Sequence, residues 1–190
     1  MLSKIYFIRH GETAWSLSGQ HTGRTEMPLL PAGELAVRAL SQKLSVVNFS
    51  QVLTSPRVRA RRTCELTGLP GVEIENDLAE WDYGDYEGLR SVEIRATRAD
   101  WDIYRDGCPN GESPAQISAR ADRLIVRLQT MSGNVALFSH GHFGRVLAAR
   151  WIGLPLDQAR HFGLSTASLN ILGYESGLQP VPAILLWNAT

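Results

Sequence analysis

The feature that most constrains the fold is an apolar run near the start of the chain that ends in a cation, an imidazole and a glycine. The run covers residues 5–8, and Arg9, His10 and Gly11 follow it directly. Consecutive β-branched and aromatic residues predict a strand that is buried on both faces of a parallel sheet. In open α/β sheets, ligands bind at the carboxyl ends of the strands. The sequence therefore predicts that these three residues lie at a ligand-binding site.

The three residues suit chemistry on a phosphate group. Arg9 supplies a planar fork that matches phosphate oxygens, and Gly11 allows a backbone N–H group to approach a ligand closely. A neutral imidazole nitrogen is a competent nucleophile, so His10 is a candidate for covalent catalysis. The alternative is a structural histidine that caps the strand. We favour catalysis because an arginine and a glycine flank His10.

A second apolar run, over residues 135–138, ends in a similar way. It leads through a serine into His140, Gly141 and His142, and a helix is expected over residues 143–152. If both runs lie in one sheet, the first histidine of each motif can face the other. The three histidines could also bind a metal. We predict neither a metal nor another cofactor, because the neighbouring arginine would repel a metal and no carboxylate ligand is adjacent.

A third motif is Ser55-Pro56, which follows a short strand expected over residues 51–54. It predicts a helix with serine as the N-cap and proline at the first helical position. Cations at a helix N-terminus oppose the helix dipole, so we expect at least one face of this helix to meet an anion. The second and fourth of its arginines share one face, and the first and third share another. The four arginines are Arg57, Arg59, Arg61 and Arg62.

Residues 79–88 form a loop that is dense in acids, aromatic residues and glycines. Aromatic walls beside a carboxylate raise its pKa, as a general acid requires. The alternative is a solvated acidic turn, and we favour that interpretation for most of these carboxylates. One of the four is expected to be functional, and the spacing does not choose between them: Glu80, Asp82, Asp85 and Glu87.

The remaining elements are expected to complete an α/β domain. Pro31 opens one helix, and Ser113 and Pro114 open a long one. The arginines of the long helix are expected on its solvated surface, because an apolar stripe occupies another face. That stripe consists of Ile117, Ala121, Leu124 and Leu128. The other expected segments are a polar loop (14–27), a strand (72–78), a helix (91–101) and a hairpin (168–174 with 183–187).

Composition narrows the class of protein. A chain of 190 residues is long enough for one domain with a full core, and we expect a single domain over 1–190. The 19 basic and 19 acidic residues balance, which argues against nucleic acid or an acidic membrane as a partner. Cys64 and Cys108 lack metal-site spacing and are expected to be reduced thiols. No apolar run approaches a membrane span, and the first strand leaves no room for a signal peptide, so we expect a cytoplasmic protein.

Six segments in this order resemble the histidine phosphatase superfamily, also called the phosphoglycerate-mutase-like family. The resemblance implies a three-layer α/β sandwich, with a mostly parallel central sheet and helices on both faces. Within the superfamily, residues 81–88, 105–108 and 141–142 are most similar to the sedoheptulose bisphosphatase branch. The six segments are Arg9-His10-Gly11-Glu12-Thr13; Thr22-Gly23; Ser55-Pro56 with Arg59-Ala60; Glu80 with Tyr83-Gly84 and Glu87-Gly88; Gly111-Glu112-Ser113; and Ser139-His140-Gly141.

The resemblance also implies a role for each matched residue. His10 would be the nucleophile that becomes phosphohistidine, and Glu80 would protonate the leaving oxygen and then activate water. Arg9, Arg59 and a protonated His140 would bind the transferring phosphoryl group and supply the charge that a metal provides elsewhere. The residues expected to bind the rest of the substrate are Gln20, Thr22, Gly23, Arg62, Tyr83, Gly141 and His142.

The function expected from this resemblance is hydrolysis of a small phosphate ester, a sugar phosphate or bisphosphate. A phosphoglycerate mutase is a competing hypothesis, but only 59 residues separate Glu80 from His140. A short lid admits water more readily, which favours hydrolysis. The same motifs would also suit a phosphoprotein phosphatase, or a module that only binds phosphoproteins. The intact nucleophile, acid and arginines argue against a purely binding role.

Overall fold

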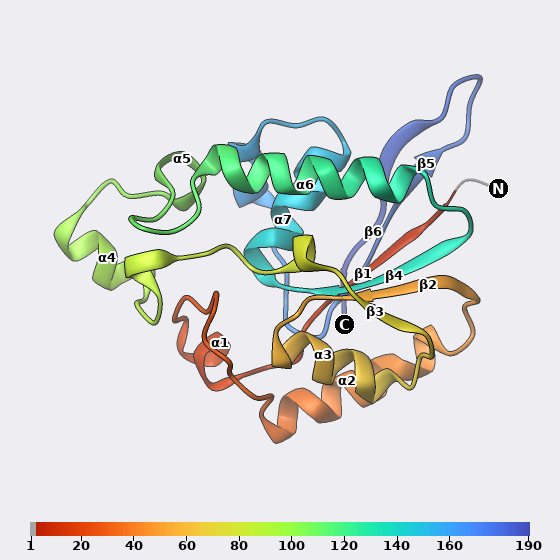
Figure 1. The fold of residues 1–190 in the computed structure, drawn as a ribbon, viewed down its shortest axis with the longest axis horizontal. Coiled ribbons are helices and arrows are strands. Elements are labelled where there is room, and N and C mark those ends of the chain that lie inside the picture. The colour runs from red at the N-terminus through yellow and green to blue at the C-terminus, as the bar shows by residue number, and fades with distance from the viewer. Residues whose placement is uncertain (1–2) are drawn as a thin grey trace.

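The computed structural model describes residues 3–190, which contain one central sheet of six strands (Figure 1). The strand order is β3-β2-β4-β1-β5-β6. The pairs β2–β3, β2–β4 and β1–β4 are parallel, whereas β1–β5 and β5–β6 are antiparallel. This arrangement confirms the mostly parallel sheet. The strands are β1 (Ile5–Arg9), β2 (Phe49–Thr54), β3 (Val72–Ile74), β4 (Asn134–Ser139), β5 (Leu169–Glu175) and β6 (Val181–Ala189).

Helices cover both faces of this sheet, so the expected three layers are present. The pair α2 and α3 lies on one face, and the pair α6 and α7 lies on the other (Figure 1). In the described part of the chain, residues 3–190, no helix has the length and apolar character that crossing a membrane requires. The helices are α1 (Ala14–Ser18), α2 (Pro31–Leu44), α3 (Val58–Thr67), α4 (Ser91–Thr97), α5 (Ile103–Asp106), α6 (Pro114–Gln129) and α7 (Gly141–Trp151).

The central strand β4 shows why its sequence is continuously apolar. Successive side chains of a strand point to opposite faces of the sheet. Val135 and Leu137 join the core cluster under α6 and α7, and Ala136 and Phe138 join the cluster under α2 and α3. Both sets are fully buried. A strand with a helical layer on each face has no position left for a polar residue, and this accounts for the apolar run.

The long helix α6 begins and buries its apolar face as the sequence predicts. Ser113 accepts a hydrogen bond from the N–H of Gln116, and the Gln116 side chain accepts one from the N–H of Ser113. This reciprocal pair is a capping box. The predicted stripe is buried along the full length of the helix: Ile117, Ala121, Leu124 and Leu128.

One arginine of α6 contradicts the expectation of a solvated surface. The Arg120 side chain is only 11% exposed and forms an ion pair with Glu112 at 2.7 Å. Its guanidinium also donates to three backbone carbonyls, at distances from 2.7 to 3.3 Å. The expectation was wrong because sequence periodicity identifies the apolar stripe but not the polar loop that packs against the helix beside it. The carbonyls belong to Asp77, Ala79 and Glu80.

Several element boundaries also differ from the expected ones. The predicted loop over 14–27 contains α1, because Thr13 and Ser16 form a capping box. Helix α3 begins at Val58, two residues later than predicted, with Arg57 as its N-cap; the Ser55 hydroxyl accepts a hydrogen bond from the Arg57 N–H and also bonds His140. The segments expected to be strand over 72–78 and helix over 91–101 end earlier, at the close of β3 and of α4.

Candidate active site

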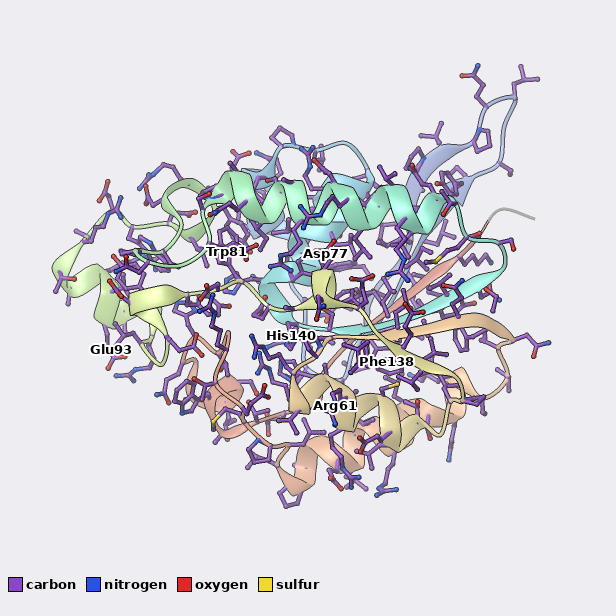
Figure 2. All side chains as sticks on the ribbon, in the orientation of Figure 1. Arg61, Asp77, Trp81, Glu93, Phe138 and His140 are labelled. Atoms are coloured by element: carbon purple, nitrogen blue, oxygen red, sulfur yellow. The ribbon has the colours of Figure 1, made fainter. Side chains whose placement is uncertain are left out.

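The carboxyl ends of three parallel strands meet at one edge of the sheet. In the strand register, Arg9 at the end of β1 lies opposite Ser139 at the end of β4, and Thr54 of β2 lies opposite Phe138. The His10 N–H donates to the Ser139 carbonyl at 2.9 Å, which extends the ladder by one residue. Figure 2 shows His140 just beyond the end of the strand that carries Phe138. The structure thus brings the rings of His10 and His140 together, with centroids 5.2 Å apart.

Two glycines allow the close packing at these strand ends. A Cβ atom on Gly11 would lie 2.8 Å from the carbonyl oxygen of Gly33 in α2. The Gly11 N–H donates to the Thr63 hydroxyl at 3.0 Å, so it does not point to a ligand as expected from the sequence. A Cβ atom on Gly141 would lie 3.2 Å from the guanidinium carbon of Arg9. Gly141 therefore lets Arg9 lie against the start of α7.

His10 is held in the form that a nucleophile requires. Its Nδ1 lies 2.7 Å from the Gly11 carbonyl, and because a carbonyl only accepts, Nδ1 carries the proton. Burial, together with the charges of Arg59 and Arg9, holds the pKa of His10 well below 6.5. The ring is 5% exposed and lines a cavity. Its Nε2 therefore carries a lone pair at neutral pH.

His140 is neutral in this structure, which differs from the protonated form expected from the sequence. Its Nδ1 accepts a hydrogen bond from Nε of Arg59 at 3.2 Å, so its Nε2–H donates to the Ser55 hydroxyl at 2.7 Å. Burial and the charge of Arg59 hold the pKa of His140 well below 6.5. The guanidinium occupies the nitrogen that would otherwise take a proton. His140 thus acts here as a link between Arg59 and β2.

The two predicted phosphate-binding arginines lie in different positions. Arg9 lines the cavity and donates through Nη1 to the Leu164 carbonyl at 2.5 Å. Arg59 is fully buried behind His140, and its terminal nitrogens donate to backbone carbonyls of the loop before α2, at 2.7 to 3.1 Å. Burial lowers the pKa of both arginines, and the carboxylate of Glu80 partly offsets this effect. Arg59 therefore positions His140 and that loop in this structure.

Glu80 is fixed at the N-terminus of α7. Its Oε1 accepts hydrogen bonds from the N–H groups of Trp81 at 2.9 Å and Phe143 at 2.8 Å, and its Oε2 accepts one from His142 at 3.0 Å. The first turn of a helix presents unpaired N–H groups and a positive dipole end, and both favour a carboxylate there. The side chain is buried and reaches the cavity.

The other acids of this loop have different partners. Asp82 forms an ion pair with Arg24 at 2.6 Å, and Asp85 accepts a hydrogen bond from Asn110. Glu87 accepts hydrogen bonds from two backbone N–H groups of residues 23–25. Within residues 3–190, Glu80 is the only carboxylate that lines the cavity. The contacts in the tertiary structure thus distinguish four acids between which the sequence spacing did not choose.

The cavity has a volume of about 220 Å³ and contains five of the seven residues expected to bind the rest of the substrate. Arg62 is not among them: its side chain pairs with Glu34 at 2.7 Å, outside the cavity. Gly23 does not line it either, because its N–H donates to the Glu87 carboxylate. The five residues in the wall are Gln20, Thr22, Tyr83, Gly141 and His142.

Sequence reasoning missed several residues of the cavity wall. His21 stacks on Tyr83 with ring centroids 4.6 Å apart, and burial lowers its pKa to about 4. Arg145 was also missed, although it follows His142 by three residues on one helix and so shares its face. That spacing is the signal that could have identified it. The missed residues are Trp15, Ser16, Gly19, His21, Ser91 and Arg145.

The three histidines considered as metal ligands do not direct free nitrogens to one point. Both nitrogens of His140 have hydrogen-bond partners, and Nδ1 of His142 bonds the Tyr83 hydroxyl at 2.7 Å. In the part of the chain from residue 3 to residue 190, no cluster of three histidine, cysteine or acidic side chains is arranged to hold a metal. The arrangement instead offers a neutral imidazole, a carboxylate and an arginine around one cavity.

The chain is similar in sequence and in fold to known phosphatases. An acid phosphatase of Mycobacterium tuberculosis is 42% identical over 95% of this chain and 91% of that protein. The sedoheptulose 1,7-bisphosphatase of Saccharomyces cerevisiae is 39% identical over 82% of this chain and 69% of that protein. The solved structure of an open reading frame product of Mycobacterium tuberculosis has a TM-score of 0.93 at 41% identity, covering 99% of this chain and 98% of the other.

The fold is also shared with a less similar protein of known structure. A putative α-ribazole-5′-P phosphatase of Escherichia coli is 26% identical and has a TM-score of 0.86, covering 100% of this chain and 97% of the other. The model that describes the histidine phosphatase superfamily (branch 1) matches residues 5–190, which include every residue of the cavity wall. The chain therefore belongs to the histidine phosphatase superfamily, branch 1.

Proposed function

We propose that this phosphatase hydrolyses a small phosphorylated metabolite, a sugar phosphate or bisphosphate, through a phosphohistidine on Nε2 of His10. The observation that carries the proposal is the state of His10. It is neutral, its Nδ1–H is bonded to the Gly11 carbonyl, and its ring faces a cavity that also contains Arg9 and Glu80. These are the groups that a covalent phosphoryl transfer requires.

In the first step, the Nε2 lone pair attacks phosphorus and the bond from phosphorus to the ester oxygen breaks. Glu80, in its protonated form, gives its proton to that oxygen, and the sugar leaves as an alcohol. Arg9 binds the oxygens of the phosphoryl group while charge is redistributed over them. A sugar alkoxide is a poor leaving group, so this proton transfer is needed.

In the second step, water replaces the imidazole. The Glu80 carboxylate takes a proton from water, whose oxygen attacks phosphorus while the bond from phosphorus to Nε2 breaks. The three backbone N–H groups hold the carboxylate in place for this proton transfer. His10 returns to its neutral form, and inorganic phosphate is released.

The cavity has a volume of about 220 Å³, and Glu80 in its wall also lines a second cavity of about 620 Å³. A small sugar phosphate as substrate is supported by the name of one relative, a sedoheptulose 1,7-bisphosphatase. We propose a cytoplasmic location as well, which is supported by two buried cysteines that form no disulfide in residues 3–190.

The His10→Ala variant tests the mechanism. It should abolish phosphate release from a panel of sugar phosphates and leave the circular dichroism spectrum unchanged. His161→Ala, at an exposed histidine that is not part of the cavity wall, is the matched control and should retain full activity. Wild-type enzyme quenched during turnover should contain an acid-labile, base-stable phosphoryl group on His10.

Two results would count against the proposal. Substantial turnover by His10→Ala would exclude a phosphohistidine at this position. A phosphopeptide that is hydrolysed with a higher kcat/KM than every sugar phosphate in the panel would exclude the substrate class.

A further inference from the structure

The cavity wall contains a cation that the proposed hydrolysis does not use. Arg145 lies on α7, three residues after His142, and lines the same cavity as His10. Its Nε is buried, and within residues 3–190 this atom has no hydrogen-bond partner. A buried donor without an acceptor is costly. This cost is relieved if a bound ligand supplies the acceptor.

The ion pairs of the protein single out the same residue. Most of the arginines pair with a carboxylate. Of those that are not exposed to solvent, three form no ion pair with any carboxylate of residues 3–190: Arg9, Arg59 and Arg145. Arg9 belongs to the proposed phosphoryl site, and the nitrogens of Arg59 already donate to His140 and to backbone carbonyls. Only Arg145 is left for another anion.

The surroundings of Arg145 lack a competing anion. Burial lowers the pKa of Arg9, and the positive charge of Arg145 lowers it further, because the two cations share one cavity. The only carboxylate in the wall formed by residues 3–190 is Glu80, and its oxygens already accept three backbone hydrogen bonds. Two cations in one cavity repel each other, but an anionic ligand is attracted by both of them, and such an arrangement is typical of an anion-binding site.

A second donor lies near Arg145. Burial raises the pKa of Tyr104 to about 12, although the charge of Arg145 acts in the opposite direction. The hydroxyl therefore keeps its proton at neutral pH. Tyr104 is 6% exposed, and the Arg145 side chain acts on its hydroxyl through both charge and a hydrogen bond. Tyr104 does not line the cavity, so Arg145 is the member of this pair that can contact a ligand there.

We propose that Arg145 binds a second anionic group of the substrate, a phosphate or a carboxylate, while Arg9 holds the phosphoryl group that is transferred to His10. The inference rests on the proposed function, because it assigns the two ends of one substrate to two arginines of one cavity. Arg145 is then a specificity-determining residue that favours small metabolites with an anionic group at each end.

The test compares substrates that have one or two anionic groups. Fructose 6-phosphate serves as the substrate with one, and fructose 1,6-bisphosphate and 3-phosphoglycerate serve as substrates with two. For each two-anion substrate, the measured quantity is its kcat/KM divided by that of fructose 6-phosphate. The bisphosphate and the phosphoglycerate arms distinguish a phosphate from a carboxylate as the second group.

Arg145→Gln should lower this ratio by about 10- to 100-fold for at least one two-anion substrate, the usual loss for a charge-assisted hydrogen bond. The loss should appear mainly in KM, because the second group is distant from the reacting atoms. Arg145→Lys keeps the charge and should recover part of the ratio. Arg150→Gln, on the same helix but paired with Asp122 and outside the cavity wall, is the control and should leave the ratio unchanged.

The inference fails if Arg145→Gln lowers kcat/KM for all three substrates by one factor, or if the wild-type ratios do not exceed one. Turnover of p-nitrophenyl phosphate separates this result from failure of the proposed function. If that turnover depends on His10 and the ratios do not respond to Arg145, only the second-anion site is wrong. If it continues in His10→Ala, the proposed mechanism itself is wrong.

Discussion

At the scale of single residues, the acids of the loop after β3 differ in what their oxygens contact. Glu80 accepts hydrogen bonds from the start of α7 and faces the cavity, whereas Asp82 pairs with Arg24. Glu87 holds the loop of residues 23–25 in place. A proton donor must reach the leaving oxygen, so the position of Glu80 in the cavity wall makes it the proposed acid.

The Glu80→Gln variant keeps the size of the side chain and removes its transferable proton. With a sugar phosphate, we expect a loss of about 10²–10⁴-fold in kcat, the usual contribution of general acid catalysis. With p-nitrophenyl phosphate, the leaving oxygen needs little protonation, so phosphorylation of His10 should be much less affected. Stopped-flow absorbance should then show a burst of nitrophenol followed by slow turnover, because the water attack still lacks its base.

The neighbouring acids provide the matched controls. Asp82→Asn, Asp85→Asn and Glu87→Gln should show the same fractional change with both substrates, since none of these carboxylates lines the cavity. If the loss of activity in one of these variants depends on the leaving group and the loss in Glu80→Gln does not, the general acid is assigned to the wrong residue.

At the scale of elements, α6 supports the active-site loop through one side chain. Figure 2 shows the segment from Asp77 to Trp81 running beside this helix. Arg120 pairs with Glu112 and donates to three carbonyls of residues 77–80, and its guanidinium lies 4.5 Å from the centre of the Phe143 ring. The backbone that carries Glu80 is thus bonded to α6 on one side and to α7 on the other.

Replacing Arg120 with methionine should destabilise the protein strongly. The variant leaves the Glu112 carboxylate unpaired in a poorly solvated site, and breaking a buried ion pair in this way costs about 3–5 kcal/mol. Urea denaturation should show the loss as a lower midpoint. The matched control is Arg123→Met on the same helix, because Arg123 pairs with Asp77 at the surface and is 61% exposed. An exposed pair contributes about 0–1 kcal/mol, so equal losses in the two variants would contradict the bridging role.

At the scale of the whole molecule, the active site concentrates neutral imidazoles. Burial is the main reason that the pKa of each lies below 6.5, and the positive charge of nearby arginines adds to the effect for several of them. The unfolded chain takes up protons at these residues near pH 6.5, and the folded chain does not. Folding therefore becomes less favourable as the pH falls below 6.5. The four residues are His10, His21, His140 and His142.

His21 gives this pH dependence a measurable size. Its pKa is about 4 in the folded protein, against 6.5 for an ordinary histidine. Between those values the unfolded state binds one more proton, so this residue alone should reduce the free energy of unfolding by about 3 kcal/mol as the pH falls from 6.5 to 4. His21→Gln should flatten the dependence by about 1.4 kcal/mol per pH unit, measured by urea denaturation at a series of pH values. A wild-type stability that stays constant over this range would contradict the buried neutral state.

The sequence by itself determined the framework of the site. The apolar runs at 5–8 and 135–138, each followed by a histidine, became neighbouring parallel strands whose ends bring His10 and His140 together. The apolar stripe and cap of α6 were equally readable. These features depend on periodicity and capping over a few consecutive residues, and such local patterns are visible without knowing the fold.

The tertiary structure alone decided which charged groups face the cavity. Arg62 and Arg145 each lie on a helix that begins near a strand end, yet the first pairs with Glu34 and the second lines the cavity. Likewise, His140 is neutral because it is buried and because Arg59, far away in sequence, donates to its Nδ1. A charged side chain takes the partner that lies nearest in space, and contacts between distant segments determine that partner. Sequence spacing therefore found the histidines at the strand ends but not the charged groups that surround them.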